Sequence, residues 1–202
     1  MSQVVMVPTG TANVASVAAA FARLGAGLAT SAGPDDVLGA AGVVLPGVGA
    51  FGAAMGQVEA LGLRQALCDR IEQGKPTLAV CVGMQILCHD SEESPGAKGL
   101  AVLDETVTRF GGDTRVPQLG WNRVEPAPGS RLLEPGWAYF ANSYHINRAP
   151  QGWRGATTEY GGTFVSALER GDILACQFHP ELSGSWGSSL LGRWLETTRE
   201  AA

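Results

Sequence analysis

Short apolar runs alternate with amphipathic stretches through the first half of the chain. The apolar runs end in proline or glycine, as buried strands do, and we expect strands at residues 3–7, 42–45 and 77–80. The stretches between them repeat apolar residues every three to four positions, and we expect helices at about residues 13–24, 53–58 and 63–73. Strands and helices in this alternation predict a mainly parallel sheet covered by helices on both faces.

The pattern changes after about Leu100, where shorter segments alternate in the manner of strands. We expect strands at residues 105–108, 138–140, 163–168 and 173–176, with turns at 161–162 and 170–172. A last helix is expected at about residues 188–199. The prediction is one α/β domain over residues 1–202, a three-layer sandwich with a mainly parallel central sheet and an antiparallel extension in the second half.

Charge and cysteine content narrow the possible functions. The net charge is −5 and the basic residues do not cluster, which argues against a nucleic-acid partner and against binding to anionic membranes. The chain has no basic, apolar leader and no apolar run of membrane-spanning length, so a cytoplasmic protein is expected. The four cysteines lack metal-site spacing, and no metal, cofactor or disulfide framework is expected. Cys68 and Cys88 fall in helical patterns and Cys176 within a strand, all three as ordinary core residues.

Cys81 is different, because it ends an apolar strand and precedes Gly83 and a helix-compatible stretch. A nucleophile presented on a strand–turn–helix elbow has this arrangement. The positive end of a helix dipole favours the thiolate, and the backbone N–H of Val82 would point toward an anion beside the sulfur. The alternative is an inert buried cysteine.

A histidine and a carboxylate follow another apolar run far downstream. Pro180 restricts the backbone after His179, so that Glu181 can project to the same side as the imidazole. Together with the elbow cysteine they would form a hydrolytic triad for acyl transfer. The rival bases are His89, expected to be solvated at a helix end, and His145, which is the weaker candidate.

A glycine loop, Pro-Gly-Val-Gly at residues 46–49, follows the second strand. Its N–H groups could stabilise a tetrahedral oxyanion, and a plain turn is the alternative. The loop lacks the pattern of a phosphate-binding loop, and no dinucleotide fingerprint follows the first strand.

These residues together resemble a known family. Cys-Val-Gly-Met-Gln at 81–85 and Gln-Phe-His-Pro-Glu at 177–181 resemble the triad-type (class I) glutamine amidotransferases. Residues 46–49, Pro-Gln-Leu-Gly-Trp-Asn at 117–122 and Tyr-Phe-Ala-Asn-Ser-Tyr at 139–144 resemble the glutaminase subunit of imidazole glycerol phosphate synthase. The resemblance covers nearly the whole chain.

The resemblance implies a role for each matching residue. Cys81 would attack the side-chain carboxamide of L-glutamine, His179 would carry the thiol proton to the leaving ammonia, and Glu181 would orient the imidazole. A glutamyl thioester would form and water would release glutamate. The implied oxyanion hole comprises Val82 and the Val48–Gly49 peptide, and the implied glutamine-binding residues are Gly49, Gln85, Ser143 and Tyr144.

The resemblance also implies a partner. In this family the ammonia passes to a (β/α)8-barrel cyclase subunit in a heterodimer, in a step of histidine biosynthesis. The motifs extend from about residue 43 to 181 and leave no stretch for an ammonia-using site, which independently favours a partner. The candidate contact residues are Asn13, Trp121, Tyr139 and Leu182. Core packing is the alternative for the two aromatic residues.

Five positions depart from the family pattern. Ala79 replaces a glycine, Gln118 and Asn142 replace histidines, Leu119 replaces a methionine, and Leu182 replaces a basic residue. None of the five belongs to the triad, so they concern regulation and partner geometry more than hydrolysis.

Three other functions remain open. One is a glutaminase for a different synthase, such as those of pyridoxal phosphate or anthranilate, which the Gly-Trp-Asn and Pro-Gly-Val-Gly segments disfavour. Another is a catalytically silent regulatory relative, against which the intact triad argues. The last is a Cys-His peptidase or stress-type hydrolase, which the His-Pro-Glu order after an elbow cysteine disfavours.

Overall fold

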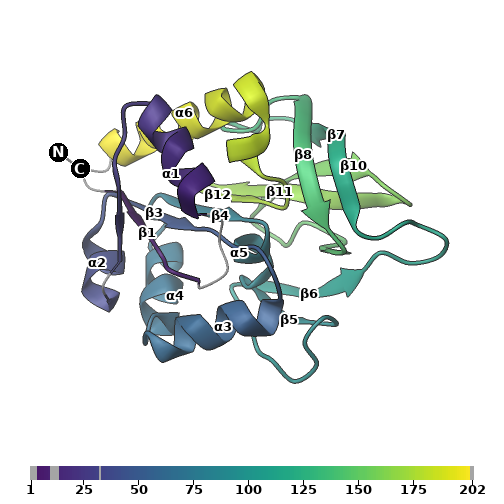
Figure 1. The fold of residues 1–202 in the computed structure, drawn as a ribbon, viewed down its shortest axis with the longest axis horizontal. Coiled ribbons are helices and arrows are strands. Elements are labelled where there is room, and N and C mark those ends of the chain that lie inside the picture. The colour runs from purple at the N-terminus through teal and green to yellow at the C-terminus, as the bar shows by residue number, and fades with distance from the viewer. Residues whose placement is uncertain (1–3, 10–13, 32, 201–202) are drawn as a thin grey trace.

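A nine-stranded sheet crosses the middle of the molecule, with helices on both of its faces (Figure 1). The computed structural model describes residues 4–9, 14–31 and 33–200. The elements are, in chain order, β1 (Val4–Met6), α1 (Val14–Arg23), β2 (Leu28–Thr30), α2 (Pro34–Gly39), β3 (Gly42–Leu45), α3 (Phe51–Ala60), α4 (Arg64–Glu72), β4 (Thr77–Val80), α5 (Val82–Gln85), β5 (Cys88–Ser91), β6 (Leu103–Arg109), β7 (Gln118–Pro126), β8 (Gly136–Asn142), β9 (Tyr144–His145), β10 (Arg154–Glu159), β11 (Thr163–Arg170), β12 (Ile173–Cys176), the 3₁₀ turn η1 (Pro180–Leu182) and α6 (Gly184–Glu200).

The sheet has a parallel half and an antiparallel half. Its order is β2-β1-β3-β4-β12-β11-β10-β7-β8. The pairs from β2 to β12 are parallel, and those from β12 to β8 are antiparallel. A small sheet of β5, β6 and β9 lies beside it. The predicted α/β sandwich with an antiparallel extension is confirmed, and the extension provides as many strand pairs as the parallel half.

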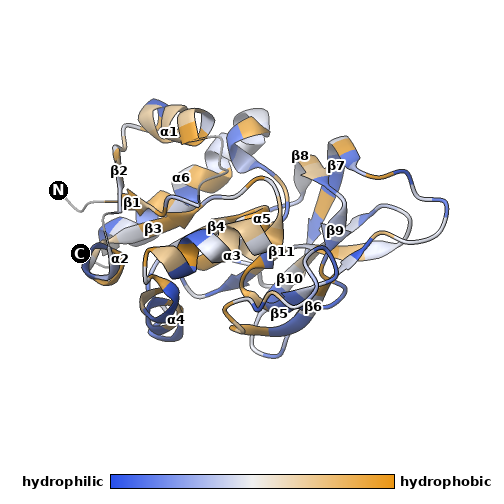
Figure 2. Ribbon diagram, turned by 60° about the horizontal axis from the view of Figure 1, so that its bottom comes forward, coloured by the Kyte–Doolittle hydropathy of each residue, from blue (hydrophilic) through white to orange (hydrophobic). Residues whose placement is uncertain are grey.

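The two helical layers are attached to the sheet by different contacts. On one face α1 packs on α6, where the rings of Phe21 and Trp194 meet edge to face at 6.0 Å (Figure 1). On the other face α4 is linked to α2 by the buried Arg70, whose guanidinium donates to the carbonyls of Val37 and Ala40 at 2.8 Å each. Apolar residues concentrate in the parallel strands between the layers, while the outer surface of α4 is polar (Figure 2). None of the helices in the described residues is long and apolar enough to cross a bilayer.

Several local predictions were wrong. The helix expected to include Cys88 ends at Gln85, and Cys88 begins β5. His89 therefore lies in a strand rather than at a helix end, although its side chain is exposed as expected. The strands β2, β7 and β10 lie where no strand was expected.

The strand order places three loops at one edge of the sheet. β4 lies between β3 and β12, all three are parallel, and Cys176 pairs with Val80. In parallel strands the carboxyl ends meet at the same edge, which is where α/β sheets bind ligands. The segments that follow β3, β4 and β12 are therefore neighbours, although they are far apart in the sequence.

Candidate active site

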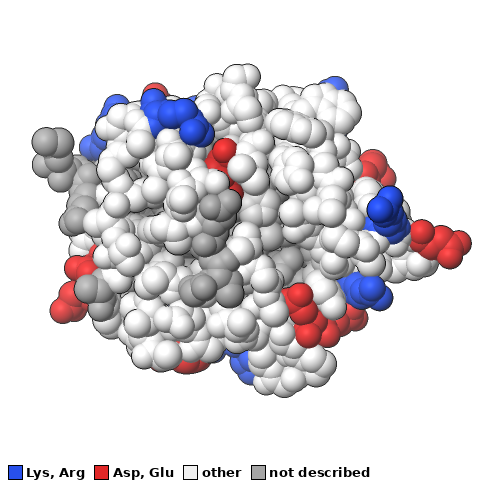
Figure 3. All heavy atoms as spheres, in the orientation of Figure 1, with Lys and Arg blue, Asp and Glu red and all other residues white. Residues whose placement is uncertain are grey.

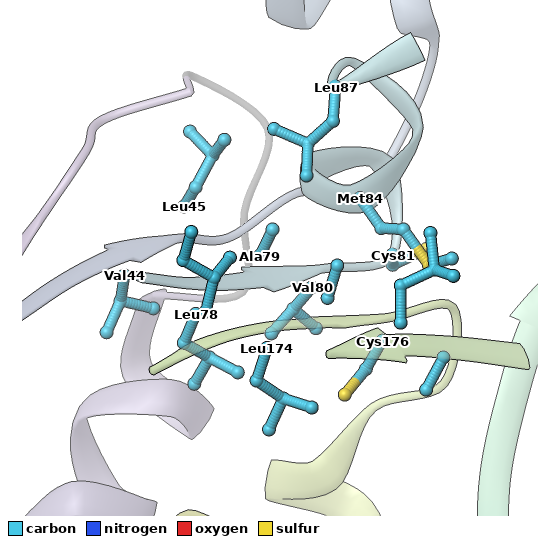
Figure 4. Close-up of a cluster of buried hydrophobic side chains, with 14 of the residues drawn as sticks. Val44, Leu45, Leu78, Ala79, Val80, Cys81, Met84, Leu87, Leu174 and Cys176 are labelled. Atoms are coloured by element: carbon cyan, nitrogen blue, oxygen red, sulfur yellow. The ribbon is translucent and has the colours of Figure 1, made fainter. Parts of the chain in front are cut away.

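Cys81 occupies a sharp turn between β4 and α5. Its backbone has φ 54° and ψ −112°, in a region that side chains other than glycine rarely adopt, which costs on the order of 1–3 kcal/mol. The neighbouring strand stabilises this conformation, because the N–H of Cys81 donates to the carbonyl of Cys176 at 2.7 Å. In Figure 4 the side chain of Cys176 projects from the sheet away from α5, so its sulfur takes no part in the turn. The elbow predicted from the sequence is confirmed.

Two glycines let the neighbouring loop approach this turn. A Cβ on Gly83 would lie 2.0 Å from the carbonyl oxygen of Leu45, and one on Gly47 would lie 2.8 Å from the Cβ of Val82. The loop 46–49 therefore packs against the start of α5. Val82 is the first residue of that helix, so its N–H has no carbonyl partner within the helix. A donor is thus available beside Cys81, on the side that the glycine loop covers.

His179 and Glu181 form the expected pair. The imidazole Nδ1 lies 2.8 Å from Oε1 of the Glu181 carboxylate, and both side chains are about 5% exposed. Burial alone would lower the pKa of His179. Hydrogen bonds with Cys81 and Glu181 outweigh that effect and raise it to about 10. A protonated imidazole between a thiolate and a carboxylate is the arrangement that nucleophilic catalysis by cysteine needs.

A cavity of about 420 Å³ lies in front of these side chains. It is lined by Val48, Gly49, Ala50, Cys81, Val82, Gln85, Glu93, Pro117, Ala141, Asn142, Ser143, Tyr144 and His179. The cavity thus contains the candidate oxyanion residues and all four candidate glutamine-binding residues. Of the triad residues, Cys81 and His179 line it, and Glu181 lies behind the imidazole.

Gln85 is held by two acceptors. Its Nε2 donates to the carbonyl of Tyr144 at 3.2 Å and to Oε1 of Gln177 at 2.9 Å. Both amide hydrogens are therefore used, and Oε1 of Gln85 is the group left to accept a hydrogen bond from a ligand. This ties the wall of the cavity to the segment after β12, which carries His179.

Sequence reasoning missed two residues of the site. Gln177 is fully buried, and its Nε2 lies 3.7 Å from Sγ of Cys81. Glu93 lines the cavity, and its Oε2 accepts the N–H of Phe51 at 2.7 Å. The signal for Gln177 was its place in the apolar run before His179, where a buried amide needs a partner. Nothing local to Glu93 distinguishes it from a surface carboxylate.

The rival histidines stay outside the site. His145 is buried and stacks on Phe110 with ring centroids 4.4 Å apart, and burial lowers its pKa. His89 pairs with Asp90 on the surface. No cluster of three or more His, Cys, Asp or Glu side chains suited to a metal occurs in the described part of the chain.

Two of the departures from the family pattern face each other across the β7–β8 pair. Gln118 and Asn142 are in register and buried, and Asn142 lines the cavity. Within the described residues, neither amide atom of Gln118 nor Oδ1 of Asn142 has a hydrogen-bond partner. Both positions therefore fall at one place in the β7–β8 pair, where Asn142 borders the cavity.

The partner candidates form an exposed group next to the triad. Trp121 is 54% exposed and Leu182 41%, while the half-buried Tyr139 meets Trp121 edge to face at 6.2 Å. Trp121 therefore does not pack in the core. The carbonyl of Tyr139 accepts the N–H of His179 at 2.9 Å, which joins this surface to the catalytic segment. Most charged side chains on the face in Figure 3 lie toward its margins. Asn13 lies outside the described residues.

Comparisons with known proteins identify the family of the chain. Residues 29–195 match the model of the class I glutamine amidotransferases. The chain belongs to this family. The chain is 40% identical over 198 residues to the imidazole glycerol phosphate synthase subunit HisH of Symbiobacterium thermophilum, covering 96% of this chain and 93% of that protein. It is 38% identical to the HisH subunit of Methanothermobacter thermautotrophicus, covering 97% and 99%.

A longer relative and solved structures complete the comparison. The imidazole glycerol phosphate synthase hisHF of Arabidopsis thaliana is 38% identical over 201 residues, and the match covers 96% of this chain and 34% of that protein. A crystal structure of a glutamine amidotransferase superposes with a TM-score of 0.77 at 21% identity, covering 96% and 98% of the two chains. A chain of PurLQS from Thermotoga maritima gives 0.72 at 16% identity, covering 97% and 99%. These structures show the same fold.

Proposed function

We propose that this amidotransferase is the glutaminase subunit of imidazole glycerol phosphate synthase, with residues 1–202 forming one catalytic domain. It hydrolyses L-glutamine to glutamate and ammonia and supplies the ammonia to a cyclase subunit. The observation that carries the proposal is the single cavity in which Cys81, paired with His179, lies next to Gly49, Gln85, Ser143 and Tyr144. Full-length HisH relatives at about 40% identity support the choice of synthase.

The reaction begins with the thiolate of Cys81 and the imidazolium of His179. Sγ attacks the carboxamide carbon of glutamine, and the carbonyl electrons move to its oxygen. The N–H of Val82, together with the Val48–Gly49 peptide, stabilises that oxyanion. His179 then protonates the nitrogen, the C–N bond breaks, and ammonia leaves a glutamyl thioester.

Water completes the cycle. The neutral imidazole of His179 takes a proton from water, which attacks the thioester carbon, and the product leaves as a carboxylic acid when Sγ returns to the thiolate. The acid then gives its proton to solvent and becomes glutamate. Glu181 orients the ring and stabilises its protonated form through the 2.8 Å hydrogen bond. Each proton that leaves one group in this scheme arrives at another, so no cofactor is needed.

The partner is proposed to dock on the surface of Trp121, Tyr139 and Leu182. In the Arabidopsis relative the matching segment is about a third of a longer protein, which is consistent with a second component beside it. The backbone of Tyr139 touches the catalytic segment twice: its carbonyl accepts from His179, and its N–H donates to Oγ of Ser183 at 3.0 Å. Ser183 in turn donates to the carbonyl of His179 at 2.6 Å. A displacement of Tyr139 by a bound partner would therefore be passed through these hydrogen bonds to the backbone of His179.

The test is glutamate release by the chain with and without a purified cyclase subunit and its ligand. Wild type should release glutamate slowly alone and faster in the complex, and Cys81→Ala should release none in either case. Cys81→Ser, which keeps the size of the side chain, serves as the matched variant for folding. Turnover by Cys81→Ala would overturn the triad, and equal wild-type rates with and without the cyclase would overturn the coupling.

A further inference from the structure

Gln177 is a fully buried side chain to which the reaction scheme above assigns no task. It directly follows β12, and its backbone N–H donates to the carbonyl of Ser166 at 2.9 Å. Its side chain makes two contacts: Nε2 lies 3.7 Å from Sγ of Cys81, and Oε1 accepts from Nε2 of Gln85 at 2.9 Å. The hydrogen bonds of a fully buried amide contribute to stability, because burying an amide group without a partner costs free energy.

The orientation of this amide follows from the network itself. The carbonyl of Tyr144 can only accept, so the group that Gln85 presents to it, at 3.2 Å, is the NH₂. The same nitrogen reaches Gln177, which must therefore present its oxygen to Gln85 and its nitrogen to Cys81. The group facing the sulfur is thus a donor, and it is polarised by the hydrogen bond that its own carbonyl accepts.

We propose that Gln177 is a positioning residue for the nucleophile, whose side-chain amide donates to Sγ of Cys81 and stabilises the thiolate alongside His179. The proposal rests on the role assigned to Cys81 and extends it. A thiolate accepts an N–H far better than a thiol does, so the contact favours the reactive form and fixes the direction of the sulfur.

The network also links the nucleophile to the substrate site. Gln85 lines the cavity and holds Gln177, so a ligand that contacts Gln85 acts on the amide facing the sulfur. Among the described residues, the titratable groups at the site are His179 with Glu181, and Glu93 and Tyr144, which line the same cavity. The Gln177 amide carries no charge and does not titrate, so its contribution is separable from that of the charged groups.

The experiment measures the pH profile for alkylation of Cys81 by iodoacetamide in the full chain, without glutamine or partner. Peptide mass spectrometry follows Cys81 alone, and Cys81→Ala is the blank. Gln177→Met removes the donor and keeps an unbranched side chain. The midpoint of its profile should rise by about one pH unit, which is a tenfold loss of thiolate at a given pH below the midpoint. Ser166→Ala, a buried change on the neighbouring strand, should keep the wild-type profile.

A second measurement needs no variant of Gln177. The side-chain amide protons of Gln177, followed by nuclear magnetic resonance in wild type, should shift with the same midpoint as the alkylation, and this titration should be lost in Cys81→Ser. Superposable alkylation profiles for Gln177→Met and wild type would overturn the inference. So would an equal shift in Ser166→Ala, or amide protons that do not respond. A wild-type Cys81 that reacts like an ordinary free thiol would instead overturn the triad, and the inference with it.

Discussion

Substitution of Gly83 by alanine tests whether close packing of the elbow builds the site. A Cβ at this position would lie 2.0 Å from the carbonyl oxygen of Leu45, whereas ordinary contacts begin at 3.4 Å. β3 and α5 must therefore separate by about 1.4 Å. Both atoms involved belong to buried elements, so no flexible side chain can absorb the change.

The expected change in unfolding free energy for Gly83→Ala follows from two opposing effects. Overpacking of a buried site costs about 1–3 kcal/mol, and a backbone contact this short lies at the upper end of that range. Alanine gains up to about 1 kcal/mol over glycine in a helix. The expected net loss is about 2 kcal/mol of unfolding free energy. Activity should fall further, on the order of 100-fold, because a displacement near 1 Å moves the loop 46–49 away from Val82 and Cys81.

Urea unfolding followed by circular dichroism, and glutamate release in the complex, measure the two losses. Gly56→Ala in α3 and Gly192→Ala in α6 are the matched controls, because a Cβ at either position meets nothing within 4 Å. Each control should gain about 0.5–1 kcal/mol of unfolding free energy and keep full glutaminase activity. A Gly83→Ala protein as stable and active as wild type would refute the reasoning, and so would controls that lose as much as Gly83→Ala does.

Three further predictions concern the charges and the surface of the site. The pKa of His179 is raised from 6.5 to about 10, so its contribution to stability is complete below pH 6.5 and is lost as pH rises toward 10. Glu181→Gln removes one cause of that shift, so its unfolding free energy, measured by urea unfolding between pH 6.5 and about 10, should fall less steeply with pH than that of wild type. An equally steep fall would contradict the prediction. Glu93→Gln should raise the KM for glutamine about tenfold with little change in kcat, because the carboxylate lines the cavity that would hold the substrate's ammonium. Steady-state kinetics measure both constants. An unchanged KM would show that Glu93 takes no part in substrate binding. Trp121→Ser should weaken cyclase binding, measured by calorimetry, at least tenfold while leaving unstimulated glutamine hydrolysis intact. Trp137 is equally exposed, and Trp137→Ser should bind the cyclase as wild type does. Equal losses of affinity in the two variants would refute a local contact at Trp121.

The triad could be read from the sequence because its evidence is local. Pro180 fixes the spacing between His179 and Glu181, and a cysteine that ends an apolar strand is recognisable without knowledge of the partner strands. The position of β12 beside β4 is not local. It depends on pairing across almost a hundred residues, and it alone brings Gln177 to Cys81. Gln177 was therefore present in the recognised motif without any visible task.

The wrong helix at Cys88 has a tertiary cause. The residues up to Cys88 have helical spacing, but the last carbonyls of this stretch are engaged by a distant segment: Ile86 accepts from Leu100, and Cys88 from Ala101. Gly99 makes this possible, since a Cβ there would lie 2.1 Å from the carbonyl oxygen of Cys88. Backbone groups satisfied by a distant segment do not need a helix, so tertiary contacts override the local preference.

Glu93 shows what such distant contacts contribute to the site. Its carboxylate accepts the N–H of Phe51, and the hydroxyl of Ser94 accepts the N–H of Gly52 at 3.0 Å, so the loop after β5 caps the start of α3. Unpaired N–H groups at a helix start favour such acceptors. Because only Ala50 separates α3 from the Val48–Gly49 peptide, the carboxylate that faces the cavity also holds the helix start next to the proposed oxyanion loop. The kinetics of Glu93→Gln separate the two roles. The amide can still accept from Phe51, so a rise in KM alone reports the lost charge, whereas a parallel fall in kcat would show that the oxyanion loop has been released.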